Sequence, residues 1–336
     1  MNESIPYWQQ VKDRVPGVAL AAALAFAAQF ISAHYGGPAM LYALLFGMVL
    51  YFLSEAPRYA PGIQWASRRV LHLGVALLGA RMGVDVFLSL GWQPVVMVVV
   101  GVSTTILFGM WLARRLGMPL YFGMLSGGAT AICGASAALA ISSVLPKEKD
   151  SESLTLFTIF GVTALSTLCM ILYPLLVTFL NLDDSTAGIL LGATIHDVAQ
   201  VVGAGFMISD VAGDHATIVK LMRVAMLVPV CVIMAMGIRQ WSGADAGEQK
   251  ASVPWFLWAF IALSVIASFH LIPPDGVAVL SDVSRACLMT AIAAIGLKTS
   301  LGRLRHIGLK PLILIVSETV FLLLIVLAML WTTGYI

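Results

Sequence analysis

The stretch Ser126-Gly-Gly-Ala-Thr-Ala-Ile-Cys-Gly-Ala-Ser136 lies in the middle of an apolar segment that we draw from residue 121 to residue 145. Its three glycines weaken a helix, and its three hydroxyl groups offer hydrogen-bond partners there. A break at membrane depth is tolerated only where the freed backbone groups meet protein, water or a ligand. The alternative is close helix packing through small residues. We expect an interrupted helix at this stretch.

A second stretch, Thr194-Ile-His-Asp-Val-Ala-Gln200, lies within the apolar segment 185–208. An ionised aspartate at the centre of a membrane helix costs about 2.5–3.5 kcal/mol, so Asp197 must line a wet cavity, pair with a cation or carry a proton. His196 adds a side chain that ordinarily titrates near neutral pH. On a helix Gln200 would neighbour both residues. The alternative is a structural Asp/His pair that holds the segment in shape.

Composition places both stretches in a membrane protein. Of the 336 residues, 60% are apolar and 11% are charged, whereas ordinary soluble domains carry about 25% charged residues. The net charge of +2, without a long basic run, argues against nucleic-acid binding. The four cysteines all fall in apolar stretches, and neither a CxxC pair nor a zinc-binding spacing is present, so we expect no disulfide framework, metal site or cofactor.

We expect an all-α polytopic membrane protein with about 11 membrane segments. Basic residues recur in every second connection, beginning with Lys12 and Arg14, which places the N-terminus in the cytoplasm. The predicted segments are residues 17–34, 38–54, 70–90, 93–113, 121–145, 153–180, 185–208, 217–238, 254–272, 284–301 and 310–333.

Two connections break this alternation of charge. If segments 121–145 and 185–208 both cross the membrane fully, Lys147 and Lys149 lie outside and the acidic turn 181–184 lies inside. Both connections return to the expected side if the two segments are opposed re-entrant hairpins. The competing interpretation is a pair of unwound helices that do cross.

The sequence also contains an internal repeat, because residues 62–119 align without a gap with residues 279–336. The alignment places Ser67 on Ser284 and Arg81 on Lys298. The two copies would run in opposite directions, and inverted repeats indicate alternating access. The single transporter domain, residues 1–336, then consists of repeat 1 at about 38–180 and repeat 2 at about 184–333.

The charged groups within the membrane segments favour an anionic substrate, since basic side chains outnumber acidic ones. The basic residues are Arg81, Lys220, Arg223 and Lys298, together with His196, and the acidic residues are Asp197 and Glu318. Lys220 and Arg223 lie one turn apart on one helix face. Alternatively, Lys220 snorkels from a helix end, and Arg81 and Lys298 cap half-helices.

The candidate site residues come chiefly from the two interrupted segments and the helix after them. The predicted substrate-binding residues are Gly127, Gly128, Thr130, Cys133, Gly134, Ser136, Thr194, Gln200, Lys220 and Arg223. We expect His196 and Asp197 to couple a proton, with Arg81, Lys298 and Glu318 as secondary candidates. For Cys133 the alternative role is that of a small apolar residue.

Five stretches carry a family resemblance. They are Ala-Ile-Cys-Gly-Ala-Ser-Ala (131–137), His-Asp-Val-Ala-Gln-Val-Val-Gly-Ala-Gly (196–205), Lys-Leu-Met-Arg-Val (220–224), Ser-Phe-His-Leu-Ile-Pro (268–273) and Gly-Leu-Lys-Pro-Leu (308–312). In these the chain resembles, over nearly its whole length, the YeiH-type sulfate exporter family of bacterial inner-membrane proteins. That family carries Glu where this chain has Asp197. The resemblance implies export of sulfate or a related sulfur oxyanion, and a fold like those of bile-acid symporters and sodium/proton antiporters, with a panel and a core domain.

We therefore expect a secondary active transporter, not an enzyme, that exports a small oxyanion across the bacterial inner membrane. No P-loop for ATP is present, so a gradient must drive transport. The expected partners are a small inorganic anion, a coupling proton or sodium ion and the lipid bilayer, without nucleic acid; a homodimer is one assembly we consider. The alternatives are a carrier of organic carboxylates or sulfonates and, more remotely, an intramembrane enzyme with Cys133 as nucleophile and His196 as base.

Overall fold

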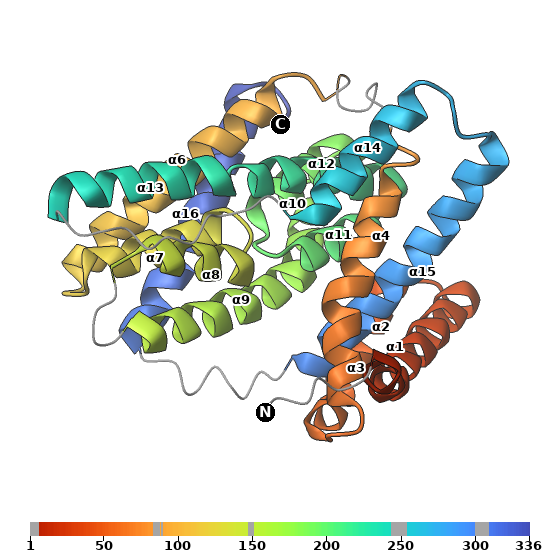
Figure 1. Cartoon of the computed structure of the whole chain (residues 1–336). Helices are drawn as coiled ribbons and strands as arrows, with labels where there is room; N and C mark the ends of the chain where they lie inside the picture. Colours follow the sequence, from red (N-terminus) through yellow and green to blue (C-terminus); the bar gives the residue numbers. More distant parts are fainter. Residues whose placement is uncertain (1–6, 83–87, 89, 147–150, 243–253, 300–308) are drawn as a thin grey trace. The chain divides into compact units, whose positions relative to one another are not determined.

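The computed structural model describes residues 7–82, 88, 90–146, 151–242, 254–299 and 309–336, and within these ranges every regular element is helical (Figure 1). Lys147 and Lys149, on which the prediction of sidedness for segments 121–145 and 185–208 depends, lie outside the described residues. The chain divides into two compact units. Unit 1 is Met1–Ser89, Val202–Ile208 and Trp255–Ser300, and unit 2 is Leu90–Val201, Ser209–Pro254 and Leu301–Ile336.

Six helical stretches of the described residues are long and apolar enough to cross a membrane. They are Lys12–Tyr35, Gln93–Arg115, Ser151–Phe179, Asp210–Ile238, Pro274–Lys298 and Leu309–Thr332. Four shorter apolar helices accompany them, and the prediction of about 11 segments exceeds what helix length and composition alone support. The chain is thus a multi-pass membrane protein, and the number of segments stays a prediction.

Unit 1 is built from α1, α2, α3, α4, α14 and α15, with short 3-10 and π turns between them. Their bounds are α1 Tyr7–Tyr35, α2 Ala39–Val49, η1 Tyr51–Glu55, α3 Ala60–Trp65, η2 Ala66–Val70, α4 Leu71–Leu78, α14 Trp255–Ser268 and α15 Pro274–Lys298. α3, η2 and α4 follow one another without a gap. The helix therefore begins about ten residues before the predicted segment 70–90, with Pro61 in its first turn, where proline's missing N–H costs nothing.

The parts of the predicted repeat that lie in unit 1, η2 with α4 and α15, pack against each other. Ser284 Oγ donates to the carbonyl of Gly74 at 2.6 Å, and Lys298 Nζ donates to Ser67 Oγ at 3.2 Å. Residue numbers rise along one helix as they fall along the other, so α4 with η2 runs antiparallel to α15. An antiparallel pair is compatible with the predicted inverted repeat, which stays a prediction. The glycine pair Gly47 and Gly296 brings α2 and α15 into backbone contact.

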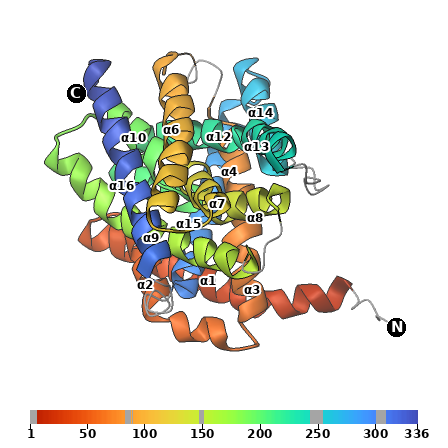
Figure 2. The same cartoon turned by 90° about the vertical axis from the view of Figure 1, so that its left-hand side faces the viewer.

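Unit 2 contains the two interrupted segments and the helices around them. Their bounds are α6 Gln93–Arg115, α7 Leu120–Ala131, α8 Ala135–Val144, α9 Ser151–Phe179, α10 Asp184–Thr194, α12 Asp210–Ala225, α13 Leu227–Ser242 and α16 Leu309–Thr332, while α11, Val198–Ile208, begins in this unit. α6 and α16 run side by side, with α7 packed against both (Figure 2). α12 begins at 210, seven residues before the predicted segment 217–238, because Ser209 caps it through the N–H of Ala212.

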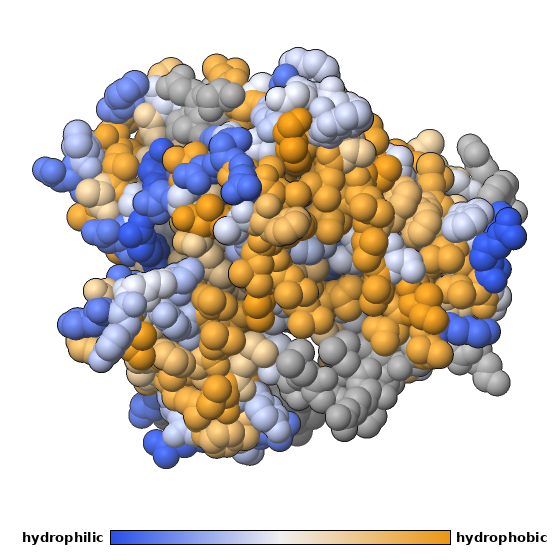
Figure 3. All heavy atoms as spheres, turned by 180° about the vertical axis from the view of Figure 1, so that it is seen from behind, coloured by the Kyte–Doolittle hydropathy of each residue, from blue (hydrophilic) through white to orange (hydrophobic). Residues whose placement is uncertain are grey.

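Large apolar side chains are exposed along the long helices. Phe26, Phe179, Leu324 and Trp331 are all more than half exposed. On the face shown in Figure 3, apolar residues form broad continuous areas and hydrophilic residues gather in smaller groups. Exposed apolar area of this extent is unfavourable in water and indicates contact with lipid.

Candidate functional site

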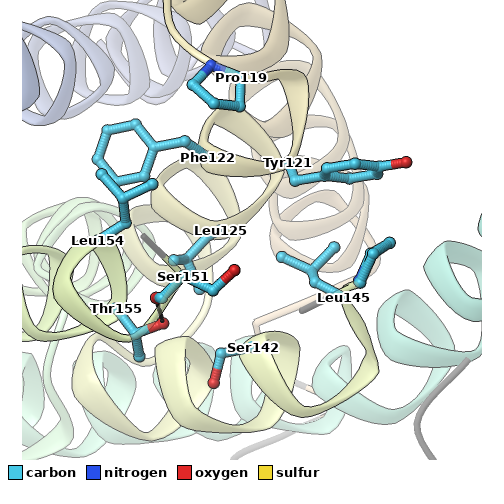
Figure 4. A pocket seen from close by; sticks show the side chains of 10 residues that line it. Pro119, Tyr121, Phe122, Leu125, Ser142, Leu145, Ser151, Leu154 and Thr155 are labelled. Atoms are coloured by element: carbon cyan, nitrogen blue, oxygen red, sulfur yellow. Dashed lines mark hydrogen bonds between the residues drawn. The ribbon is translucent and has the colours of Figure 1, made fainter. Parts of the chain in front are cut away.

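The first break lies between α7 and α8, and the chain folds back on itself there. Gly134 has a φ of 64° and a ψ of −126°, a conformation that L side chains rarely adopt, and it starts α8. A Cβ at Gly128 would collide with the side chain of Ile141 across the fold. The outer ends of α7 and α8 line one pocket together with the start of α9, so α7 and α8 form a hairpin (Figure 4). The lining residues are Pro119, Tyr121, Phe122, Leu125, Ser142, Leu145, Pro146, Ser151, Leu154 and Thr155.

The second break lies between α10 and α11 and has the same character. α10 runs parallel to α12: near its start Ser185 Oγ lies 2.9 Å from His215 Nδ1, and near its end Gly192 lies against Val219. α12 begins directly after Ser209, level with the start of α10. The residues between α10 and α12 must therefore lead the chain back to the level at which α10 begins, so α10 and the residues after it form a second hairpin. The first hairpin opens beside the start of α9, and the second opens beside its end.

The tips of both hairpins meet halfway along the long helices of unit 2. Gly127 lies against Ile106 at the middle of α6. Ser166 Oγ, at the middle of α9, accepts the backbone N–H of Asp197 at 3.0 Å. Thr319, at the middle of α16, lies 2.9 Å from His196. If these helices span a bilayer, the tips lie near its midplane.

Lys220 joins the two tips. Its ammonium group, which is fully buried, donates to the carbonyl of Ile132 at 2.7 Å, to that of Ile195 at 2.9 Å and to that of His196. These three bonds use all three of its N–H groups. The charge of Lys220 thus offsets the partial negative charge at the C-terminal ends of α7 and α10.

Arg223, one turn further along α12, makes the same connection with a wider reach. Its Nε donates to the carbonyl of Ala131 at 2.7 Å and one terminal nitrogen donates to Thr130 at 3.0 Å. The other terminal nitrogen donates to Gly192 at 3.1 Å and to Ile195 at 2.9 Å. Four of its five N–H groups therefore bond carbonyls in or just after the last turns of α7 and α10.

His196 links the second tip to α16 and to the first tip. Its Nδ1 lies 3.0 Å from the carbonyl of Thr130, which can only accept, so Nδ1 carries the hydrogen. In the neutral ring Nε2 is then an acceptor, and Thr319 Oγ1 donates to it. Thr319 Oγ1 also lies 2.8 Å from the carbonyl of Ile315. Protonation of His196 would turn the Thr319 hydroxyl toward that carbonyl.

Glu318 is fully buried beside the first hairpin. Ser126 Oγ donates to its Oε1 at 2.7 Å, and Thr130 Oγ1 donates to its Oε2 at 3.2 Å. Gly109 on α6 leaves room for this carboxyl, because a Cβ there would collide with Oε1. Sequence reasoning named Glu318 without finding a partner, since its partners lie almost two hundred residues away on α7.

Asp197 and Gln200 face α9 from the start of α11. The Asp197 carboxylate accepts the backbone N–H of Ala199 at 3.1 Å, which caps the start of α11. Gln200 Nε2 lies 3.5 Å from Thr167 Oγ1, and Gln200 Oε1 is buried without a partner among the described residues. A buried amide oxygen without a partner can accept a hydrogen bond from a water molecule or a ligand.

The remaining predicted residues of the tips have different surroundings. Thr194 donates to the carbonyl of Leu190 within its own helix at 2.6 Å. Cys133 is buried and contacts the backbone of Ala137. Ser136, in contrast, is exposed at the start of α8. Both ring nitrogens of His196 bond other groups, which speaks against a nucleophile and base pair with Cys133.

Two secondary candidates, Arg81 and Lys298, belong to unit 1. The Arg81 guanidinium lies 5.4 Å from the centre of the Phe206 ring, and Lys298 bonds Ser67 as described above. Sequence reasoning missed Thr319, Ser166 and Thr167 as partners of the tips. In the sequence each of these residues is a hydroxyl at the centre of a long apolar helix. Such a hydroxyl is equally typical of ordinary helix packing, so it does not by itself indicate a site.

These features define a class: multi-pass helical membrane proteins in which two opposed hairpins meet at a buried, positively charged centre. The family described as "Conserved hypothetical protein 698" matches residues 16–315. The chain is 49% identical to a UPF0324 membrane protein of Chlorobaculum tepidum, over 93% of this chain and 88% of that one. It is 47% identical to the UPF0324 membrane protein TauZ of Paracoccus pantotrophus, over 99% and 100%, and 34% identical to the UPF0324 inner membrane protein YeiH of Escherichia coli K12, over 89% and 88%.

The chain belongs to the UPF0324 family of membrane proteins, which includes YeiH. The resemblance read from its sequence motifs is thereby confirmed. No solved structure matches this one.

Proposed function

We propose that the protein is a secondary active transporter that exports a small oxyanion, sulfate or a related sulfur oxyanion, by alternating access. The observation that carries this proposal is the meeting of two opposed hairpin tips around the fully buried Lys220 and Arg223. Irregular backbone at membrane depth is tolerated where it is buried in protein or lines a cavity, and transporters with inverted repeats place their substrate sites at such breaks near the midplane.

The start of α8 is the best place for the anion. Its first N–H groups have no partner within the helix, and Gly134 brings no side chain to cap them, although the Cys133 sulfur accepts the N–H of Ala137. Ser136 adds an exposed hydroxyl at the same point. The start of α11 is already occupied by the Asp197 carboxylate. Lys220 and Arg223 hold the tips through carbonyls and supply the net positive charge that favours an anion there.

The division into two compact units fits alternating access, because one body has to move against another. In this scheme the ion gradient acts through the titratable groups of the tips, His196 and Asp197. A proton on Asp197 would weaken its cap on Ala199, and a proton on His196 would reverse its bond with Thr319. Both changes alter the second hairpin without contact with the anion.

The test is flux of radiolabelled sulfate, sulfite and thiosulfate in proteoliposomes under imposed proton or sodium gradients. We expect flux in the wild type, and at least a tenfold loss in Ser136→Asp, because its carboxylate occupies the helix start that the anion needs. Ser136→Asn has nearly the same shape without the charge and should retain flux. Absence of flux with every sulfur oxyanion from folded wild-type protein would refute the substrate, and full flux in Ser136→Asp would refute the site.

A further inference from the structure

We infer that Glu318 is a proton-binding site of the transport cycle and that its protonation controls how tightly the first hairpin is held to α16. This inference rests on the proposed function and goes beyond it, because it adds to the His196/Asp197 pair a further group that binds a coupling proton. The carboxyl is fully buried at the middle of α16, a span of 24 residues, where an ionised acid is expensive.

The neighbours of Glu318 suit both of its protonation states. Ser126 and Thr130 offer hydroxyl groups, and a hydroxyl can donate to a carboxylate or accept from a carboxylic acid. After protonation, the carboxyl O–H would donate to one hydroxyl oxygen, and that hydroxyl would turn to a carbonyl of its own helix. A guanidinium or ammonium partner would have fixed the charged state instead.

The other titratable residues of the helices packed around Glu318 either lie near the ends of those helices or are hydrogen-bonded to other groups. Those near the ends are Arg114 and Arg115 of α6, Tyr121 of α7, Glu152 of α9, Asp184 of α10 and Lys310 of α16. Two more, Cys169 and Tyr173, lie within α9. Cys169 and Tyr173 bond each other. His196, Lys220 and Arg223 approach from the tips and bond the backbone carbonyls of Thr130, Ile132 and their neighbours.

A proton at this position affects the hairpin directly. Ser126 and Thr130 lie in the last turns of α7, immediately before the break, so the ionised carboxylate ties the first tip to α16 by two charge-assisted hydrogen bonds. Such bonds are roughly twice as strong as neutral ones. Protonation therefore loosens the attachment of α7.

A second buried polar group lies on α6, on the face that Gly109 presents to Glu318. Thr105, four residues before Gly109, carries a fully buried hydroxyl that has no partner among the described residues.

The experiment is infrared difference spectroscopy of the full-length protein in liposomes during a pH titration, which does not depend on transport. We expect a carbonyl-stretch band of a protonated carboxylic acid that titrates in the wild type, disappears in Glu318→Gln and persists in Asp197→Asn. Ser126→Ala, which leaves the acid in place, should shift the frequency of that band because a hydrogen bond is lost.

Flux then connects this site to transport: Glu318→Gln should lose the acceleration by a proton gradient that the wild type shows. An unchanged titrating band in Glu318→Gln, or a band that responds to sodium at fixed pH and not to pH, would overturn the inference. Should the wild type carry no sulfur oxyanion, the spectroscopic result still decides whether Glu318 binds the proton. Failure of the inference and failure of the proposed function are thus separable.

Discussion

Arg223 shows how far a single side chain can organise a membrane protein. Its planar fork reaches carbonyls of both hairpins, Thr130 and Ala131 on one side and Gly192 and Ile195 on the other. Lysine carries the same charge as a compact point and cannot span these positions. The arginine is therefore needed for its shape as well as for its charge.

Replacement of Arg223 by lysine should destabilise the protein, because some of these carbonyls lose their donor. The expected cost is about 1–3 kcal/mol for each buried acceptor left without a hydrogen bond. The measurement is reversible unfolding in mixed detergent micelles. Arg114→Lys, an exposed site at the end of α6, is the matched control and should unfold like the wild type. Equal stability of Arg223→Lys and the wild type would contradict the role given to the fork.

The two hairpins are the elements on which the site depends, and each is shaped by backbone chemistry at its tip. At the first tip only glycine adopts the conformation of Gly134 without strain. A Cβ there would have ordinary van der Waals contacts, the nearest at 3.8 Å from His196, so backbone strain and not collision is the cost of a side chain.

Gly134→Ala should lower the free energy of unfolding by about 1–3 kcal/mol through this strain. Gly237→Ala is the control, because Gly237 lies within α13 with no atom near its missing Cβ. There alanine should leave stability unchanged or raise it by up to about 1 kcal/mol. Thermal unfolding of both variants in the same detergent measures the difference. Equal effects of the two substitutions would rule out strain at the first tip.

The second hairpin begins at a cap that should make stability depend on pH. Asp183 accepts the N–H groups of Ser185 and Thr186 at 2.9 and 3.1 Å. Partial burial alone would raise the pKa of Asp183, but the hydrogen bonds from Thr186 and Ser185 outweigh it, and the pKa lies below the ordinary value of 3.8. A lowered folded-state pKa means that the cap contributes fully above pH 3.8 and is lost as the pH falls further.

Asp183→Ala should therefore cost about 1 kcal/mol at neutral pH, the usual worth of a cap, and almost nothing in strong acid. Asp184→Ala, one residue later and also exposed, removes a charge near the helix start without removing the cap, so its effect should be smaller. Unfolding followed by circular dichroism across the acid range distinguishes the two. A loss for Asp183→Ala that is independent of pH would exclude the ionised cap.

Sequence patterns located both breaks but not the contacts made there. Three glycines around Cys133, and a His-Asp pair in an apolar run, mark irregular backbone because few other structures accommodate them at membrane depth. The partners of Lys220 could not be predicted, since they are backbone carbonyls that are offered only after the tips have met. The partners of Glu318 depend on the packing of α16 against α7, which leaves no periodicity in either helix.

At the scale of the whole molecule, the structure offers six helical stretches that could span a bilayer and a pair of hairpins that enter from opposite ends of α9. If the long helices span a bilayer, hairpins in this arrangement are the alternative that keeps the predicted alternation of charged connections, and the sidedness itself stays a prediction. The basic end of α6 then shares one side of the membrane with the open end of the first hairpin. The acidic turn before α10 shares the other side with the start of α12.

Cysteine accessibility in cells tests this topology with two pairs of single substitutions. Pro119→Cys and Pro146→Cys flank the first hairpin, and Asp184→Cys and Asp210→Cys flank the second. An impermeant thiol reagent should reach both members of the second pair from outside and both members of the first pair only from the cytoplasmic side, in inverted vesicles. Of the native cysteines, three are buried and Cys287 is partly exposed, so unsubstituted protein sets the background. Two helices that cross fully would instead separate the members of each pair, since the chain would change sides between them.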